Sequence, residues 1–174
     1  LSALLTLDIS YNRLVQLPDD VFLSLTSLQE LNLAGNGLTE LQGDGFRSLI
    51  GLRRIDLSYN QLASVSEHLF EGSPYLYAVA LNSNKLDELP EAIFQNLREV
   101  RLLFLQDNVI TSIPEGTFQG LPELAHLNLQ NNLFLAVSPY LFSPYGFSEQ
   151  AIVYLYGVPL TQEMKDLIVS LIGD

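Results

Sequence analysis

The sequence predicts an α/β solenoid, an arc of parallel strands along a concave face with a capping helix at its C-terminal end. Two columns of residues predict it. Asparagines recur every 24 residues, and phenylalanines keep the same step; they are Asn12, Asn36, Asn60, Asn84, Asn108 and Asn132, with Phe22, Phe46, Phe70, Phe94, Phe118 and Phe142. A constant period of this size indicates one structural unit copied in series. Such units bury their apolar faces against one another and so form a solenoid.

The repeating unit becomes visible when the chain is aligned on the asparagines. Repeats then begin at residues 4, 28, 52, 76, 100 and 124. Residues 4–14 read L-x-x-L-x-I-x-x-N-x-L, and residues 17–25 (L-P-x-x-x-F-x-x-L) return at 89–97. Over residues 1–147 the pattern resembles the 24-residue "typical" subclass of the leucine-rich repeat family. The resemblance implies one short strand per repeat and a function in recognition.

Each position of the repeat has a physical task. Leu7 and Ile9 alternate with polar residues, which is the period-two pattern of a half-buried strand. We expect these strands to stack in parallel with their leucines inward. The asparagine amides can donate to and accept from buried backbone groups of successive turns, which are costly to leave unpaired. We expect the phenylalanines to pack the opposite, convex wall.

The two ends of the chain differ. Leu1-Ser2-Ala3 align with the last three positions of a repeat, so we expect this chain to be a piece of a longer protein. We assign residues 1–147 to the repeat array and 148–174 to a degenerate strand at 153–155 followed by a cap helix. Val158 replaces the asparagine there, and Thr161 is a good N-cap. The apolar helical stripe is Met164, Leu167, Ile168, Leu171 and Ile172. A helix that docks on a partner is the alternative.

Composition restricts the partners. The net charge is −12 with eight basic residues. Nucleic acid and anionic membranes need clustered Lys and Arg, so we expect neither as a partner. The chain contains no run of eighteen apolar residues, so the sequence predicts no membrane insertion. The chain has no cysteine and no N-glycosylation sequon. Family resemblance favours an extracellular or cell-surface location, and these two absences weaken that inference.

The sequence predicts no enzyme and no cofactor. It contains two histidines. His68 reads as a surface residue, and His126 lies on a strand beside Asn128 without a Ser–Asp pair in register. A catalytic triad needs three groups within mutual reach. Paired carboxylates such as Asp87-Glu88 lie on solvated turns rather than in the apolar surroundings that raise a catalytic pKa.

The outward strand positions carry the information about a partner, because core packing does not dictate them. Across the six repeats they form three rows: Thr6, Glu30, Arg54, Ala78, Leu102, His126; Asp8, Asn32, Asp56, Ala80, Phe104, Asn128; and Ser10, Ala34, Ser58, Asn82, Gln106, Gln130. The face is polar at both ends and apolar in repeats four and five. Two small residues beside two large ones predict a step or shallow notch.

Aromatic residues and arginines around an apolar centre are typical of a binding hot spot. We therefore predict a partner-binding surface made of Arg53, Arg54, Tyr77, Ala78, Ala80, Arg101, Leu102, Phe104 and His126. Two alternatives for Phe104 are packing against its own array and coverage by a segment outside this chain.

The interpretation that follows is a non-catalytic protein-recognition module, part of a larger receptor or adaptor, that binds a protein partner through its concave face. One alternative is a structural subunit of a multiprotein assembly, held by its edges or by its tyrosine-rich C-terminal region. Another is a substrate-recruiting arm of an enzyme whose catalytic domain lies outside this chain. The sequence does not indicate the oligomeric state.

Overall fold

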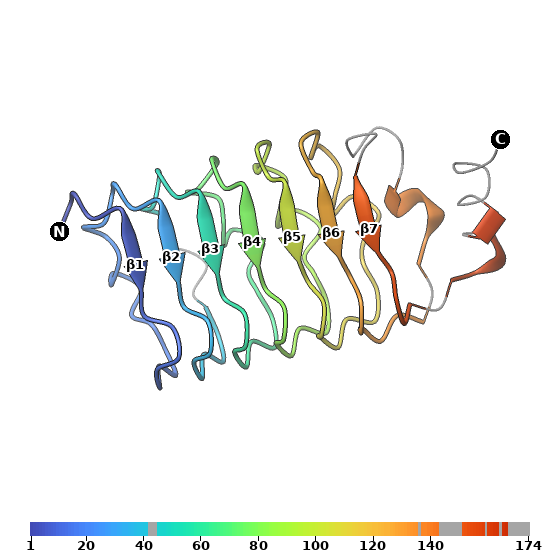
Figure 1. Cartoon of the computed structure of the whole chain (residues 1–174), viewed down its shortest axis with the longest axis horizontal. Coiled ribbons are helices and arrows are strands. Elements are labelled where there is room, and N and C mark those ends of the chain that lie inside the picture. The colour runs from blue at the N-terminus through green and yellow to red at the C-terminus, as the bar shows by residue number, and fades with distance from the viewer. Residues whose placement is uncertain (42–44, 136, 143–150, 159, 164, 167–174) are drawn as a thin grey trace.

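The computed structural model describes residues 1–41, 45–135, 137–142, 151–158, 160–163 and 165–166. They form a coil whose turns stand side by side (Figure 1). Seven strands of three residues pair in chain order into one parallel sheet: β1 (Thr6–Asp8), β2 (Glu30–Asn32), β3 (Arg54–Asp56), β4 (Ala78–Ala80), β5 (Leu102–Phe104), β6 (His126–Asn128) and β7 (Ile152–Tyr154). A 3-10 helix, η1 (Pro139–Phe142), lies between β6 and β7. The predicted solenoid with a parallel sheet is confirmed.

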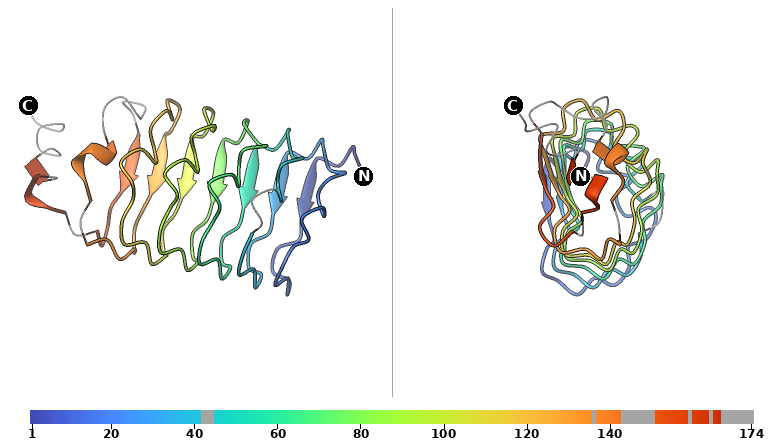
Figure 2. Two further views of the ribbon diagram at one scale, coloured as in Figure 1. Left: turned by 180° about the vertical axis from the view of Figure 1, so that it is seen from behind. Right: turned by 90° about the vertical axis from the view of Figure 1, so that its right-hand side faces the viewer.

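The strands lie along one side of the coil, and the return segments run along the other, as the view down the long axis shows (Figure 2). We call the outward side of β1–β7 the strand face. From β1 to β6, paired residues are 24 positions apart, as in Glu30 with Arg54 and Arg54 with Ala78. The pairing of β6 with β7 joins His126 to Ile152, because the last repeat is two residues longer. β7 therefore begins one residue before the predicted 153–155.

The core runs along the inner side of the sheet. The central strand residues Leu31, Ile55, Val79, Leu103 and Leu127 are each at most 1% exposed. Leu7, their counterpart in β1, is only half-buried. The reason is that β1 is the first strand of the row and has a neighbour on one side only.

The asparagine column joins each turn to the one before it. Asn84 Nδ2 donates to Leu57 O of the preceding repeat at 3.0 Å and to Leu81 O of its own repeat at 3.1 Å. Its Oδ1 accepts the Leu62 N–H at 3.1 Å. Buried Asn36, Asn60, Asn108 and Asn132 repeat this pattern. Asn12 is exposed, and among the described residues it donates only within its own turn, to Ile9 O and Ser10 O.

The residue before each of these asparagines turns the chain inward. Tyr11, Tyr59, Ser83, Asp107 and Asn131 have φ between 52° and 58°. This left-handed conformation is uncommon outside glycine. Gly35 takes the same position in the second repeat with φ of 66°. The asparagine that follows each of these residues stabilises the bend through its side-chain hydrogen bonds.

The phenylalanine column packs opposite the sheet. Phe22, Phe46, Phe70, Phe94 and Phe118 are between 0% and 3% exposed. Phe70, Phe94 and Phe118 stack with ring centroids 6.3 and 6.0 Å apart, and Phe22 meets Phe46 at 6.0 Å in a tilted pair. Such ring pairs add about 0.5–1.5 kcal/mol beyond their buried area. The side chain of Phe142 lies outside the described residues.

The C-terminal segment is helical at Gln162, Glu163, Lys165 and Asp166. The Lys165 N–H donates to Thr161 O at 3.1 Å, which is the first turn of that helix. The predicted apolar stripe at Met164, Leu167, Ile168, Leu171 and Ile172 lies outside the described residues, so capping stays a prediction. Val158 takes the position that the column asparagine has in the other repeats, and it is buried, with 8% of its surface exposed. Within the described part of the chain, no helix is both long and apolar enough to cross a membrane.

Candidate partner-binding surface

The strand register brings the predicted apolar residues together. Ala78 pairs with Leu102, and Ala80 pairs with Phe104, across β4 and β5. His126 is the neighbour of Leu102 on β6. Paired strands lie about 4.8 Å apart. These residues therefore form a contiguous apolar step on the strand face, between the polar face of β1–β3 and the mixed face of β6.

The large side chains of the step do not stand fully out into solvent. Leu102 and Phe104 are half-buried, as is Ala80, and Ala78 is 5% exposed. Part of each large side chain is therefore shielded from solvent, and part is exposed. Gln106 follows Phe104 on the same face, and its buried Oε1 accepts no hydrogen bond among the described residues. An unpaired buried acceptor is uncommon and costs free energy.

A second feature borders the step where β3, β4 and β5 begin. Three residues occupy the same position in successive turns there, namely Arg53, Tyr77 and Arg101. Backbone hydrogen bonds join them: the Tyr77 N–H donates to Arg53 O and the Arg101 N–H donates to Tyr77 O, each at 2.8 Å. With Arg98, Glu99, Pro122 and Glu123 they line a hollow of ≈ 540 Å³. We call it the arginine hollow. Arg101 Nη2 lies 3.2 Å from Glu123 Oε2.

Four of the residues that line the arginine hollow, Arg98, Glu99, Pro122 and Glu123, were not predicted. They lie in the turns before β5 and β6 rather than in the three outward rows of the strands. A signal for them was present, since Glu99 and Glu123 are also 24 residues apart. Extending the columns into the turns would have found them.

Arg54 belongs to a different part of the strand face. It lines a small polar hollow of ≈ 120 Å³ with Asp8, Glu30, Asn32 and Asp56, among others. The Ser10 hydroxyl and backbone N–H donate to Asp8 Oδ1 at 2.6 and 2.9 Å, and these bonds lower the pKa of Asp8. Asn32 Nδ2 also donates to this carboxylate, at 3.2 Å. The strand face is thus acidic over β1–β3 and apolar over β4–β5.

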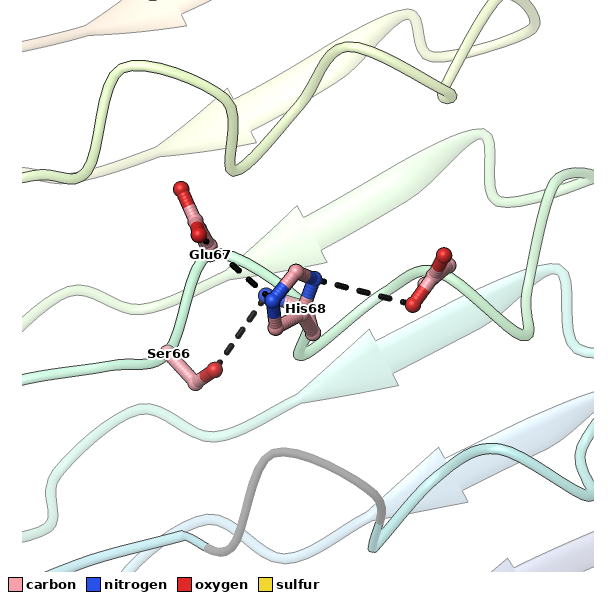
Figure 3. Close-up of polar contacts among 4 residues, drawn as sticks. Ser66, Glu67 and His68 are labelled. Atoms are coloured by element: carbon pink, nitrogen blue, oxygen red, sulfur yellow. Dashed lines mark hydrogen bonds and ion pairs between the residues drawn. The ribbon is translucent and has the colours of Figure 1, made fainter.

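The two histidines lie in different parts of the structure. His68 lies on the exposed outer side, where its ring nitrogens are 3.5 Å from Glu67 Oε1 and 3.6 Å from Glu71 Oε2 (Figure 3). His126 lies between Leu102 and Ile152 in the sheet. Among the described residues, no group of three His, Cys, Asp or Glu side chains could hold a metal ion.

Solved structures with the same fold include three leucine-rich repeat proteins. A leucine-rich repeat protein of Leptospira interrogans is 26% identical, with a TM-score of 0.70 over 97% of this chain and 35% of its own. TLR13, solved as a complex with ssRNA13, is 28% identical, with a TM-score of 0.78 over 88% of this chain and 21% of its own.

The leucine-rich repeat domain of APL1B is 22% identical, with a TM-score of 0.71 over 75% of this chain and 38% of its own, and shows the fold alone. The chain thus spans well under half the length of each of these structures. No curated protein sequence matches it.

A family model described as leucine rich repeat matches three overlapping stretches, residues 1–38, 26–77 and 74–134. These stretches contain β1–β6 and the asparagine column. The 24-residue spacing of the paired strands agrees with the repeat length of the typical subclass. The chain belongs to the leucine-rich repeat family.

Proposed function

We propose that this chain is a non-catalytic protein-recognition module within a larger receptor or adaptor, and that it binds a protein partner through the strand face. The observation that carries the proposal is the apolar step. Leu102 and Phe104 stand beside Ala78 and Ala80, and the neighbouring strands β1–β3 carry only polar or charged residues outward, among them Asp8, Glu30 and Asp56. A single exposed apolar residue needs no explanation, whereas a cluster bordered by polar residues marks an interaction site.

The chemistry of the step fits a hot spot. An aromatic ring with a small neighbour offers a knob and a recess, and Tyr77 and Arg101 stand at its edge. Hot spots are rich in aromatic residues and arginine and lie where a surrounding rim excludes water. Removing the exposed part of Leu102 and Phe104 from water would stabilise a complex by about 25 cal/mol for each Å² of apolar surface.

The family supports recognition in general. The leucine-rich repeat fold and the similarity to TLR13 fit a recognition module. TLR13 was solved with RNA. This chain carries a net charge of −12, and that charge repels a polyanion over a Debye length of about 8 Å at physiological salt. A protein partner therefore suits this chain better than RNA.

One observation favours a second candidate, a structural subunit held at its C-terminal end. Tyr140, Tyr154 and Tyr156 are 69%, 39% and 78% exposed near the last strand. Tyrosine is enriched at interfaces because its apolar ring carries a polar tip. In an assembly held this way, changes on the strand face of β4–β5 would leave binding unchanged.

The test compares three variants of the full chain. Immobilised wild-type chain captures partners from native extracts, and each is then titrated by calorimetry against Phe104→Ala, Arg54→Glu and Glu91→Ala. Phe104→Ala should weaken binding by about 2 kcal/mol or more, and Arg54→Glu should mainly slow association. Exposed Glu91 lies on the outer side and serves as the control. A Phe104→Ala variant that melts early, yet binds in proportion to its folded fraction, would assign Phe104 to the core.

A further inference from the structure

The arginine hollow carries information about the partner's own chemistry, and the inference from it rests on the proposed function. We propose that the hollow binds a carboxylate side chain of the partner, supplied by an extended acidic segment that also places a large apolar residue on Phe104.

The hollow concentrates positive charge in an acidic protein. Arg53, Arg98 and Arg101 are three of the eight basic residues in a chain of net charge −12, and all three line it. Arg101 pairs with Glu123, while Arg53 and Arg98 form no ion pair with any described residue. A guanidinium binds a carboxylate through two parallel hydrogen bonds, which gives both strength and orientation. Two guanidinium groups are therefore available to an incoming carboxylate.

Glu123 already shows how a carboxylate fits the rim of the hollow. Its Oε2 lies 3.2 Å from Arg101 Nη2, and both side chains are more than half exposed. Exposed ion pairs of this kind contribute about 0–1 kcal/mol. Glu123 is thus an internal competitor that a partner carboxylate displaces at little cost. Removing its charge should strengthen binding, which is the opposite of the effect expected for an arginine.

The distance between the hollow and the apolar step defines a spacing in the partner. Arg101 directly precedes β5, and Phe104 is three residues further along the same extended chain. At about 3.3 Å per residue, the two Cα atoms are separated by about 10 Å. An extended partner segment spans that distance with about three residues. We therefore expect an Asp or Glu about three positions from a large apolar residue.

A short acidic segment fits the hollow better than a nucleic acid does. Glu99 and Glu123 also line it, so three arginines face two carboxylates and the local charge is only weakly positive. A nucleic-acid strand would be repelled both by these two carboxylates and by the net charge of −12. One carboxylate that is held beside an apolar anchor avoids most of that repulsion.

The test uses a phage-displayed library of random twelve-residue peptides selected on the full chain. Enriched peptides should carry Asp or Glu about three positions from Phe, Leu, Met or Trp. Synthetic versions of these peptides are then titrated by fluorescence anisotropy. Arg98→Gln should weaken binding by about two- to fivefold, and Glu123→Gln should strengthen it by about twofold or more. Arg47→Gln removes the same charge from an exposed arginine outside the hollow and should change little.

Three outcomes would overturn this inference. One is an equal effect of Arg98→Gln and Arg47→Gln, which would show a dependence on net charge alone. A second is the enrichment of peptides without acids that respond to Phe104→Ala but not to Arg98→Gln; the proposed function would then stand without the acidic segment. The third is a competition result: a single-stranded RNA oligonucleotide that displaces the labelled peptide at a lower concentration than unlabelled peptide does. Conversely, peptides that respond to Arg98→Gln but not to Phe104→Ala would support the carboxylate site and contradict the apolar anchor.

Discussion

Replacing Asn84 with alanine tests the part of the fold on which the strand face depends. The change removes the acceptor of the Leu62 N–H at 3.1 Å and the donor to Leu57 O, Leu81 O and Asn82 O at 3.0, 3.1 and 3.3 Å. The Leu62 N–H is buried, and a buried donor without a partner costs about 1–3 kcal/mol. Each of the three carbonyls keeps another donor: Asn60 Nδ2 for Leu57 O, Asn108 Nδ2 for Leu81 O and the Tyr59 N–H for Asn82 O. We therefore expect a loss of about 1–3 kcal/mol in the free energy of unfolding.

The matched control is Asn12→Ala, the same substitution in the first member of the column. Asn12 is exposed, and within the described part of the chain it donates only to Ile9 O and Ser10 O, at 3.0 and 3.1 Å. It should cost less than about 0.5 kcal/mol, as surface substitutions usually do. Urea unfolding followed by circular dichroism measures both losses, and hydrogen exchange of the Leu62 amide locates the first. Equal losses in the two variants, or a loss of a few tenths at Asn84, would refute the inter-turn role of the column.

Two further predictions concern the ends and the outer wall of the coil. Deleting residues 161–174 should expose the apolar end of the array, causing aggregation or fraying from that end; unchanged hydrogen exchange in β6 and β7 and a monomeric variant would show that the segment is not a cap. Gly72→Ala should lower the free energy of unfolding, measured by heat or urea, by about 1–3 kcal/mol, because the added Cβ would overlap the Arg47 backbone. The control is Gly37→Ala, whose Cβ would lie 3.4 Å from Leu14 O, an ordinary contact distance, and which should be close to neutral. Similar stability of these two variants would contradict the close approach of Gly72 to the Arg47 backbone.

The sequence was sufficient to predict the solenoid and its parallel sheet, because one period of 24 residues determines both. Once Asn12 and Asn36 are aligned, strand pairing follows, since residues one repeat apart must lie side by side. The outward rows of the strands could be assigned from the repeat alignment alone for the same reason. The last strand was displaced by one residue, because the sixth repeat is longer and the period no longer fixes the register there.

Other features depend on three-dimensional context that the pattern does not contain. Tyr11 and Tyr59 adopt positive φ against their local preference, because the asparagine that follows each of them fixes the turn. Phe104 was assigned to the outward side of its strand, and the structure shows it half-buried there. A sequence row shows which side a residue faces and does not show how far its neighbours cover it. The arginine hollow was only partly predicted, because four of its seven lining residues lie in turns, and only the other three directly precede strands.

The central claim is that a partner covers the strand face at β4 and β5, and cysteine protection tests it most directly. The chain contains no cysteine, so Ala80→Cys and Glu91→Cys each introduce a single thiol, one beside Phe104 and one on the outer side. Maleimide labelling is followed by mass spectrometry with and without a saturating captured partner. We predict that the partner slows labelling at A80C by about tenfold or more, because interface cores exclude water, and leaves E91C unchanged. Equal labelling of A80C with and without partner would contradict the claim.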